Sequence, residues 1–144
     1  MKALRIAGYP LAQLFTFVLI LISGEAFGGP YLVYLILALP HGGDYSVLGT
    51  GGILCLYICH KLYRIKRRAW VKPVLHLAGI LLTLLSLYIF FINDRIRYNY
   101  GTFLQSVPLV TLWLFGISVL CGMVLAVIQL ARLRINRHGF PTPH

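Results

Sequence analysis

The stretch HKLYRIKRRAW, His60 to Trp70, decides how this sequence is interpreted, because it concentrates basic residues between two apolar segments. Five of the chain's 13 Lys and Arg residues fall within these eleven positions. A basic run of this kind is typical of a nucleic-acid-binding patch or of a loop that lies on a membrane surface. Its position favours the membrane, and we expect it to be a cytoplasmic elbow between two membrane helices.

The overall composition points the same way. Hydrophobic residues make up 59% of the 144-residue chain and charged residues 11%, and the mean hydropathy is +0.83. Soluble domains have about 45–50% of the first kind and about 25% of the second. So few polar residues cannot cover the surface of a water-soluble domain. The sequence therefore predicts a membrane protein of a single small domain, and its formal net charge of +10 has to be interpreted by position.

Four apolar segments are long enough, or nearly so, to cross a bilayer core, which takes roughly 20 helical residues. They cover about residues 3–23, 46–63, 73–92 and 107–131. Pro73 and Pro108 stand near helix starts, where a missing N–H costs little, and Pro10 either kinks the first helix or marks where it begins. We expect an all-α bundle of four membrane helices over residues 1–131, followed by a short basic cytoplasmic tail over residues 132–144.

The distribution of positive charge predicts the topology. If the amino terminus is cytoplasmic, 11 of the 13 Lys and Arg residues lie on the cytoplasmic side, and only Arg95 and Arg97 lie outside. The positive-inside rule then gives both termini inside, in what we expect to be a bacterial inner (plasma) membrane. The residues expected to contact lipid headgroups are Lys61, Arg64, Lys66, Arg67, Arg68 and Lys72. Nucleic acid is not an expected partner, because so short an elbow has no room for base-stacking platforms.

Two segments allow more than one interpretation. Residues 30–40 include nine apolar residues, Tyr31 to Leu39, bracketed by prolines; as a helix they extend only about 13 Å, too short to cross. This outer segment therefore lies in the membrane interface or enters the membrane as a re-entrant piece. The first apolar segment, which follows Lys2 and Arg5, also loosely resembles a cleaved signal peptide.

Each predicted helix carries small and polar residues at helical spacing, and these stripes are expected to face one bundle interior. They either pack the helices together or line a polar pathway or ligand pocket. The residues expected there are Gln13, Thr16, Gly52, His76, Gly79, Thr83, Ser86, Thr111, Ser118, Gly122 and Gln129.

Groups with chemical potential are few. His60 and His76 flank the elbow and are the candidates for ligating a haem or a metal, although two histidines are too few for a zinc site. Cys55, Cys59 and Cys121 are expected to be small packing residues, and no cysteine lies in the outer loops. An outer polar rim, able to bind a cation or a basic partner, would consist of Glu25, His41, Asp44 and Asp94.

The sequence contains no nucleotide-binding loop, zinc-protease motif or nucleophile elbow. We therefore expect a non-enzymatic accessory or interaction subunit without a cofactor, whose partners are the lipid bilayer and other membrane proteins or further copies of itself. The first alternative is a small transporter or channel with a polar bundle interior. The second is a redox membrane protein that binds a haem or a metal through His60 and His76.

Overall fold

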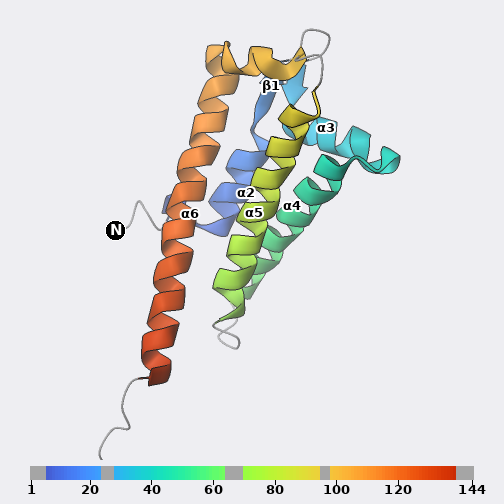
Figure 1. The fold of residues 1–144 in the computed structure, drawn as a ribbon. Coiled ribbons are helices and arrows are strands. Elements are labelled where there is room, and N and C mark those ends of the chain that lie inside the picture. The colour runs from blue at the N-terminus through green and yellow to red at the C-terminus, as the bar shows by residue number, and fades with distance from the viewer. Residues whose placement is uncertain (1–5, 24–27, 64–69, 95–97, 139–144) are drawn as a thin grey trace, which may run out of the picture.

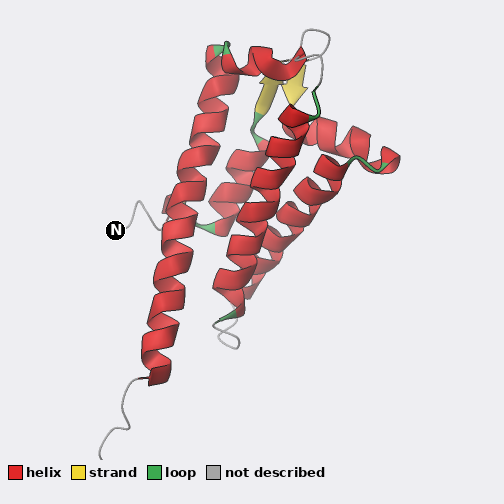
Figure 2. Ribbon diagram, in the orientation of Figure 1, coloured by secondary structure: helices red, strands yellow, loops and turns green. Residues whose placement is uncertain are grey.

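The computed structural model describes residues 6–23, 28–63, 70–94 and 98–138 of the chain. Helices dominate these residues, and one pair of short strands lies at one end of the molecule (Figure 2). The predicted all-α class is confirmed in this main feature.

Helices α4 (Asp44–Leu62) and α5 (Val71–Ile92) run antiparallel side by side and form the centre of the fold (Figure 1). The chain enters α4 through Gly42, whose φ of 68° is a backbone conformation that suits glycine. Asp44 then places a negative charge in the first turn of α4, at the positive end of the helix dipole. Both helices agree with the predicted segments 46–63 and 73–92 to within two residues.

Helix α6 (Ser106–His138) stands beside this pair and is the longest element described. Its 33 residues extend about 50 Å, well beyond an apolar bilayer core of about 30 Å. The predicted end at residue 131 is too early, because residues 132–138 continue the helix instead of beginning the tail. Good helix formers in this stretch, such as Arg132 and Leu133, explain the continuation.

The prediction of one helix over residues 3–23 is wrong. Helix α2 (Pro10–Val18) has nine residues, about 13 Å in length, and the chain then becomes strand β1 (Leu21–Ser23). Pro10 occupies the first helical position, so it marks the start of α2. Strand β1 pairs antiparallel with β2 (Gly28–Pro30), and a sheet of any kind was not expected.

Contacts from distant residues explain why β1 is not helical. The Leu21 N–H donates to Thr111 Oγ1 (3.1 Å) and the Ser23 N–H donates to Thr102 Oγ1 (2.9 Å). The other edge of β1 pairs with β2. The strand therefore finds hydrogen-bond partners on both edges, as a buried backbone requires.

Two shorter elements complete the same end of the fold. Helix α3 (Tyr31–Ala38), extended by the 3₁₀ turn η1 (Leu39–His41), projects away from the bundle beside the start of α4 (Figure 1). The 3₁₀ segment η2 (Tyr98–Phe103) leads into α6 and contacts β1. The short apolar helix predicted between the two prolines is thus present, while its depth relative to a membrane stays a prediction.

Two of the described helices, Val71–Ile92 and the Ser106–Ile135 part of α6, are long and apolar enough to cross a membrane by length and composition. Helix α4 has 19 residues, but it contains three glycines together with Asp44, His60 and Lys61, and it does not pass the same test. Helix α2 is too short.

The interior of the fold is unusually polar and its surface unusually apolar. Gln13, His76, Thr83 and Ser86 are completely buried, whereas many large apolar side chains, such as Leu120, are exposed. An aromatic cluster, with Tyr31 packed edge-on against Phe90 and Phe17, fills the interior at the sheet end. Exposed apolar surface on this scale is typical of a protein that is surrounded by lipid or by partners.

Candidate functional site

The primary amide of Gln13 connects three helices at the centre of the fold. Its Nε2 donates to the backbone oxygen of Ser118 in α6 (3.0 Å), and its Oε1 accepts a hydrogen bond from Nε2 of His76 in α5 (2.7 Å). Gln13 and His76 are both fully buried. We call Gln13, His76 and Ser118, together with Gly122, the central polar cluster.

Gly122 and Ser118 make room for this arrangement. A Cβ atom at Gly122 would overlap the amide nitrogen of Gln13, so only glycine allows the Gln13 side chain to approach α6. The Ser118 hydroxyl donates to the backbone oxygen of Ala7 (2.8 Å) and so ties the segment before α2 to the same turn of α6. Both residues were predicted to face the interior, and both are buried.

The hydrogen bonds also determine which nitrogen of His76 carries the proton. Because the Gln13 nitrogen donates to Ser118, its oxygen is the atom that faces the ring, and Nε2 of His76 must be the donor. In this tautomer Nδ1 is an acceptor. It is buried and has no hydrogen-bond partner among the described residues, which costs about 1–3 kcal/mol for such a group.

The α4–α5 interface uses small residues for close packing. A Cβ atom at Gly52 would come within 2.6 Å of the Thr83 side chain, and one at Gly79 within 2.8 Å of Leu56. The Thr83 hydroxyl donates to the Gly79 oxygen within its own helix (3.0 Å). These three predicted interior residues therefore hold the helix pair together.

Ser86 connects the same interface to α3. Its hydroxyl donates to the Tyr45 backbone oxygen (2.6 Å) and lies 2.8 Å from the Tyr31 hydroxyl. Burial raises the pKa of Tyr31 well above its usual value, an effect that the hydrogen bond to Ser86 partly offsets. The Tyr31 hydroxyl therefore stays neutral. Nearby, the Ser46 hydroxyl donates to the Leu35 oxygen (2.6 Å).

A second polar group lies where α4 ends, α5 begins and α6 passes. The Tyr9 hydroxyl lies 3.1 Å from Nδ1 of His60, and the Tyr9 ring packs edge-on against that of Tyr63. The Tyr63 hydroxyl is hydrogen-bonded to the Gln129 amide, and Nζ of Lys72 lies 5.7 Å from the centre of the Tyr63 ring. We call these five residues the basal rim.

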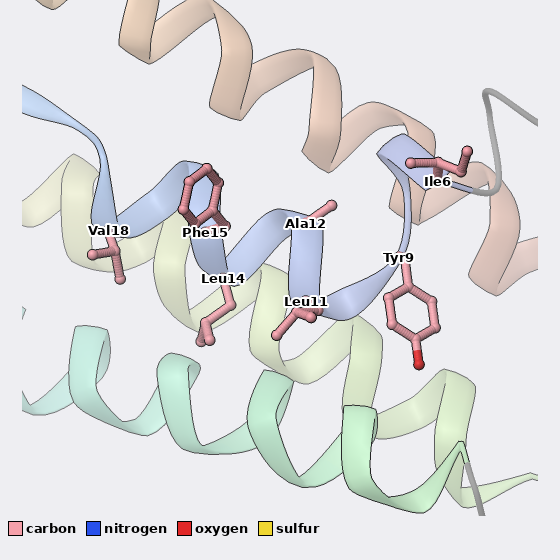
Figure 3. Close-up of a pocket in the computed structure, with 7 residues that line it drawn as sticks. All are labelled: Ile6, Tyr9, Leu11, Ala12, Leu14, Phe15 and Val18. Atoms are coloured by element: carbon pink, nitrogen blue, oxygen red, sulfur yellow. The ribbon is translucent and has the colours of Figure 1, made fainter.

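An apolar groove lies along α2 and the segment before it, and its lining residue Tyr9 places one end of the groove at the basal rim (Figure 3). Its volume is about 780 Å³. Helix α2 contributes the lining side chains Leu11, Ala12, Leu14, Phe15 and Val18, and the preceding segment contributes Ile6 and Tyr9. Tyr9 points toward the end of α4 and brings a polar atom to that end of the groove.

The hydroxyls of the two remaining pathway candidates both donate to a backbone oxygen of their own helix. The Thr16 hydroxyl donates to the Ala12 oxygen of its own helix (3.0 Å), and the Thr111 hydroxyl donates to the Pro108 oxygen (2.7 Å) while accepting from Leu21.

The residues predicted for the outer polar rim have separate partners. His41 Nδ1 lies 3.1 Å from the Leu37 oxygen, and an Asp94 carboxylate oxygen accepts a hydrogen bond from the Asn99 N–H (2.7 Å). Asp44 is exposed at the start of α4, and Glu25 lies outside the described residues. The described part of the chain contains no group of three His, Cys, Asp or Glu residues that could hold a metal ion.

Other predicted residues are placed as follows. His60 and His76, proposed together as haem or metal ligands, belong to two different hydrogen-bonded groups. Cys59 is buried and donates a hydrogen bond to the Lys72 oxygen (3.2 Å), and Cys55 and Cys121 are also free thiols. Of the expected headgroup contacts, Lys61 and Lys72 are described, while Arg64, Lys66, Arg67 and Arg68 lie outside the described residues.

Tyr9, Tyr31 and Tyr63 contribute hydroxyls to these polar groups and were not among the predicted site residues. Each has a hydroxyl hydrogen-bonded to a side chain on another element. The available signal was that a tyrosine within or next to an apolar segment brings a hydroxyl that needs a hydrogen-bond partner.

Comparisons of this chain with protein-family models, with curated proteins and with solved structures found no match.

Proposed function

We propose that this chain is a four-span membrane protein that works, without catalysing a reaction, as an accessory or interaction subunit of a membrane assembly. Its membrane location is supported by the two long apolar helices and by the reversed distribution of polarity, with hydrogen-bonded polar side chains inside and large apolar ones outside. A lipid environment favours this arrangement, because exposing the same apolar side chains to water would cost a large free energy.

The other two spans would be α4 and the segment from about residue 6 to β1. Helix α4 lies along most of the length of α5, so a membrane that α5 crosses would also enclose α4 (Figure 1). The N-terminal segment would cross partly as α2 and partly as β1. A strand is tolerated at that depth only if its backbone groups are satisfied by protein, and Thr102, Thr111 and β2 supply partners. The charge distribution favours cytoplasmic termini in a bacterial inner membrane.

The outward face of α6 is the surface best suited to a protein partner, and this observation carries the proposal. Only 28% of the apolar stretch of α6 that could cross a membrane is buried within the chain. Gly116 has open space where a Cβ would be, between the exposed side chains of Trp113 and Leu120. A small residue on a lipid-facing helix lets a second helix approach closely, which is how membrane helices associate.

The glycines inside the fold are not available for association with a partner. The glycines at Gly52, Gly79 and Gly122 are in contact with other helices of the same chain, so they are not free to contact a partner. The buried polar side chains are likewise bonded mainly to each other, which favours a packing role over a transport pathway.

Crosslinking at defined positions tests the proposal. A photoreactive amino acid at Leu120 on α6 should give a crosslinked protein adduct in intact cells, whereas one at Leu81, an equally apolar and exposed position on α5, should not. Gly116→Leu should reduce the Leu120 adduct several-fold, because the larger side chain keeps a partner helix away. The proposal fails if the two positions give equal amounts of protein adduct. It also fails if neither position gives an adduct and the purified chain runs as a monomer.

A further inference from the structure

We propose that the groove along α2 binds one acyl chain of an anionic phospholipid, whose headgroup lies at the basal rim. The inference rests on the proposed membrane location, and it assigns a ligand to a surface that the interaction face on α6 does not use. It depends on the shape of the groove, on its polarity, and on the positions of the described cations.

The wall of the groove is apolar along α2, and its polar atom, the Tyr9 hydroxyl, lies at one end. Its wall is built from leucine, alanine, phenylalanine and valine side chains of α2, and Leu11 and Phe15 remain exposed beside it. The Tyr9 hydroxyl, bonded to His60, stands where the groove meets the basal rim. A hydrocarbon tail along the wall would therefore leave no polar atom of the wall without its partner.

Among the residues that the structure describes, the basic side chains lie toward one end of the groove. The described Lys and Arg side chains are Lys61 at the end of α4, Lys72 at the start of α5, and Arg132 and Arg134 beyond Gln129 on α6. The end of α4, the start of α5 and the C-terminal part of α6 all lie toward the end of the bundle opposite the sheet (Figure 1). Cations near a bilayer surface each attract an anionic headgroup by about 1 kcal/mol.

Lys72 is the described Lys or Arg residue within the basal rim. Its Nζ lies over the ring of Tyr63, which packs against Tyr9 at the end of the groove. The Tyr63 hydroxyl and the Gln129 amide, already bonded to each other, lie at the same place and can also bond to phosphate oxygens. A phosphate at this point would be close to a positive charge and to polar groups at once.

The shape of the wall favours a flexible chain over a partner helix. Close helix packing in membranes uses small residues, and Ala12 is the one small side chain among those lining this groove. The bulky side chains on either side of Ala12 would hold another helix away. An acyl chain can bend to follow such an uneven surface.

Lipid titration followed by native mass spectrometry tests the inference. The purified full-length chain in mild detergent is titrated with dioleoylphosphatidylglycerol or, separately, with dioleoylphosphatidylcholine. We expect one lipid per chain, with the anionic lipid bound several-fold more tightly. Ala12→Trp should weaken binding of both lipids at least tenfold by filling the groove, and Ala78→Trp, which adds the same bulk on α5, should leave both unchanged.

The Lys72→Gln variant examines the headgroup separately and does not depend on Ala12→Trp remaining folded. It should weaken phosphatidylglycerol binding about fivefold, which corresponds to about 1 kcal/mol, and leave phosphatidylcholine binding unchanged. Equal binding of the two lipids by the wild type, or equal effects of the Ala12 and Ala78 variants, would overturn the inference. A protein adduct from a photoreactive residue at Phe15 would overturn it in favour of a partner helix.

The two proposals fail in different ways. If the chain is released from membranes by alkaline carbonate, the proposed membrane function is wrong. If it stays in the membrane and its Leu120 adduct is present, but the lipid preference is absent, only the lipid site is wrong.

Discussion

The side chain of Gln13 shows how one amide can hold a polar interior together. Its oxygen accepts a hydrogen bond from His76 and its nitrogen donates one to the Ser118 backbone oxygen. Each of these bonds links two elements far apart in sequence. A buried polar group that loses its partner costs more than the bond itself contributes, because the group cannot return to water. The stability of the central polar cluster should therefore depend on its residues jointly.

A double-mutant cycle at Gln13 and His76 checks this dependence. Gln13→Leu alone should lower the free energy of unfolding by about 2 kcal/mol, because the His76 N–H and the Ser118 oxygen lose their partner. His76→Leu alone should cost a comparable amount. The double variant should cost less than the sum, with a coupling of about 1 kcal/mol measured by unfolding in detergent mixtures. Strictly additive effects would contradict the hydrogen bond.

Gly122 and Gly116 offer a matched pair on the same helix. Gly122→Ala should destabilise the fold by about 1–3 kcal/mol, because the added methyl group overlaps the Gln13 amide. Gly116→Ala meets open space and should be neutral or slightly stabilising, since alanine is the better helix former. Melting temperatures of the two variants, measured side by side, test this difference in packing. A loss at Gly116 equal to that at Gly122 would show that the packing is wrong.

At the scale of elements, the least expected feature is the strand that follows α2. The sequence of residues 19–22, LILI, contains isoleucine and leucine, which are found in both helices and strands. An apolar run of this kind cannot be assigned from its own periodicity. The threonines that bond to β1 come from η2 and α6, more than 75 residues later.

The role of these threonines can be measured with isosteric changes. Thr102→Val keeps the volume of the side chain but removes the acceptor for the Ser23 N–H in a buried place. It should cost about 1–2 kcal/mol of unfolding free energy. Thr16→Val is the control, because the Thr16 hydroxyl bonds only within its own helix, and it should cost less. Equal losses would mean that β1 does not depend on Thr102.

At the scale of the whole molecule, four spans with both ends inside predict which loops share a compartment. In a parent with its three cysteines replaced by alanine, His138→Cys on the α6 end should react with an impermeant maleimide only after the membrane is opened. His41→Cys in η1, at the opposite end of the bundle, should react in intact cells. Labelling of both positions from the same side would refute the four-span topology.

The sequence by itself determined the polarity of this protein, the helices α4, α5 and α6 and the short apolar helix α3. These depend on composition and on local patterns, because an apolar run of sufficient length, bounded by proline, glycine or charge, forms a helix in many surroundings. Gly52, Thr83 and Ser118, which helical spacing assigned to the interior faces of α4, α5 and α6, are buried in the structure.

Only the tertiary structure decided where the first apolar segment stops being helical, which polar side chains pair, and where the groove lies. Strand β1 exists because Thr102, Thr111 and β2 offer its backbone partners that no neighbouring residue supplies. The Gln13–His76 pair and the groove along α2 arise from helices that meet only after the chain has folded. Contacts of this range follow from packing geometry, which a linear pattern of residues does not contain.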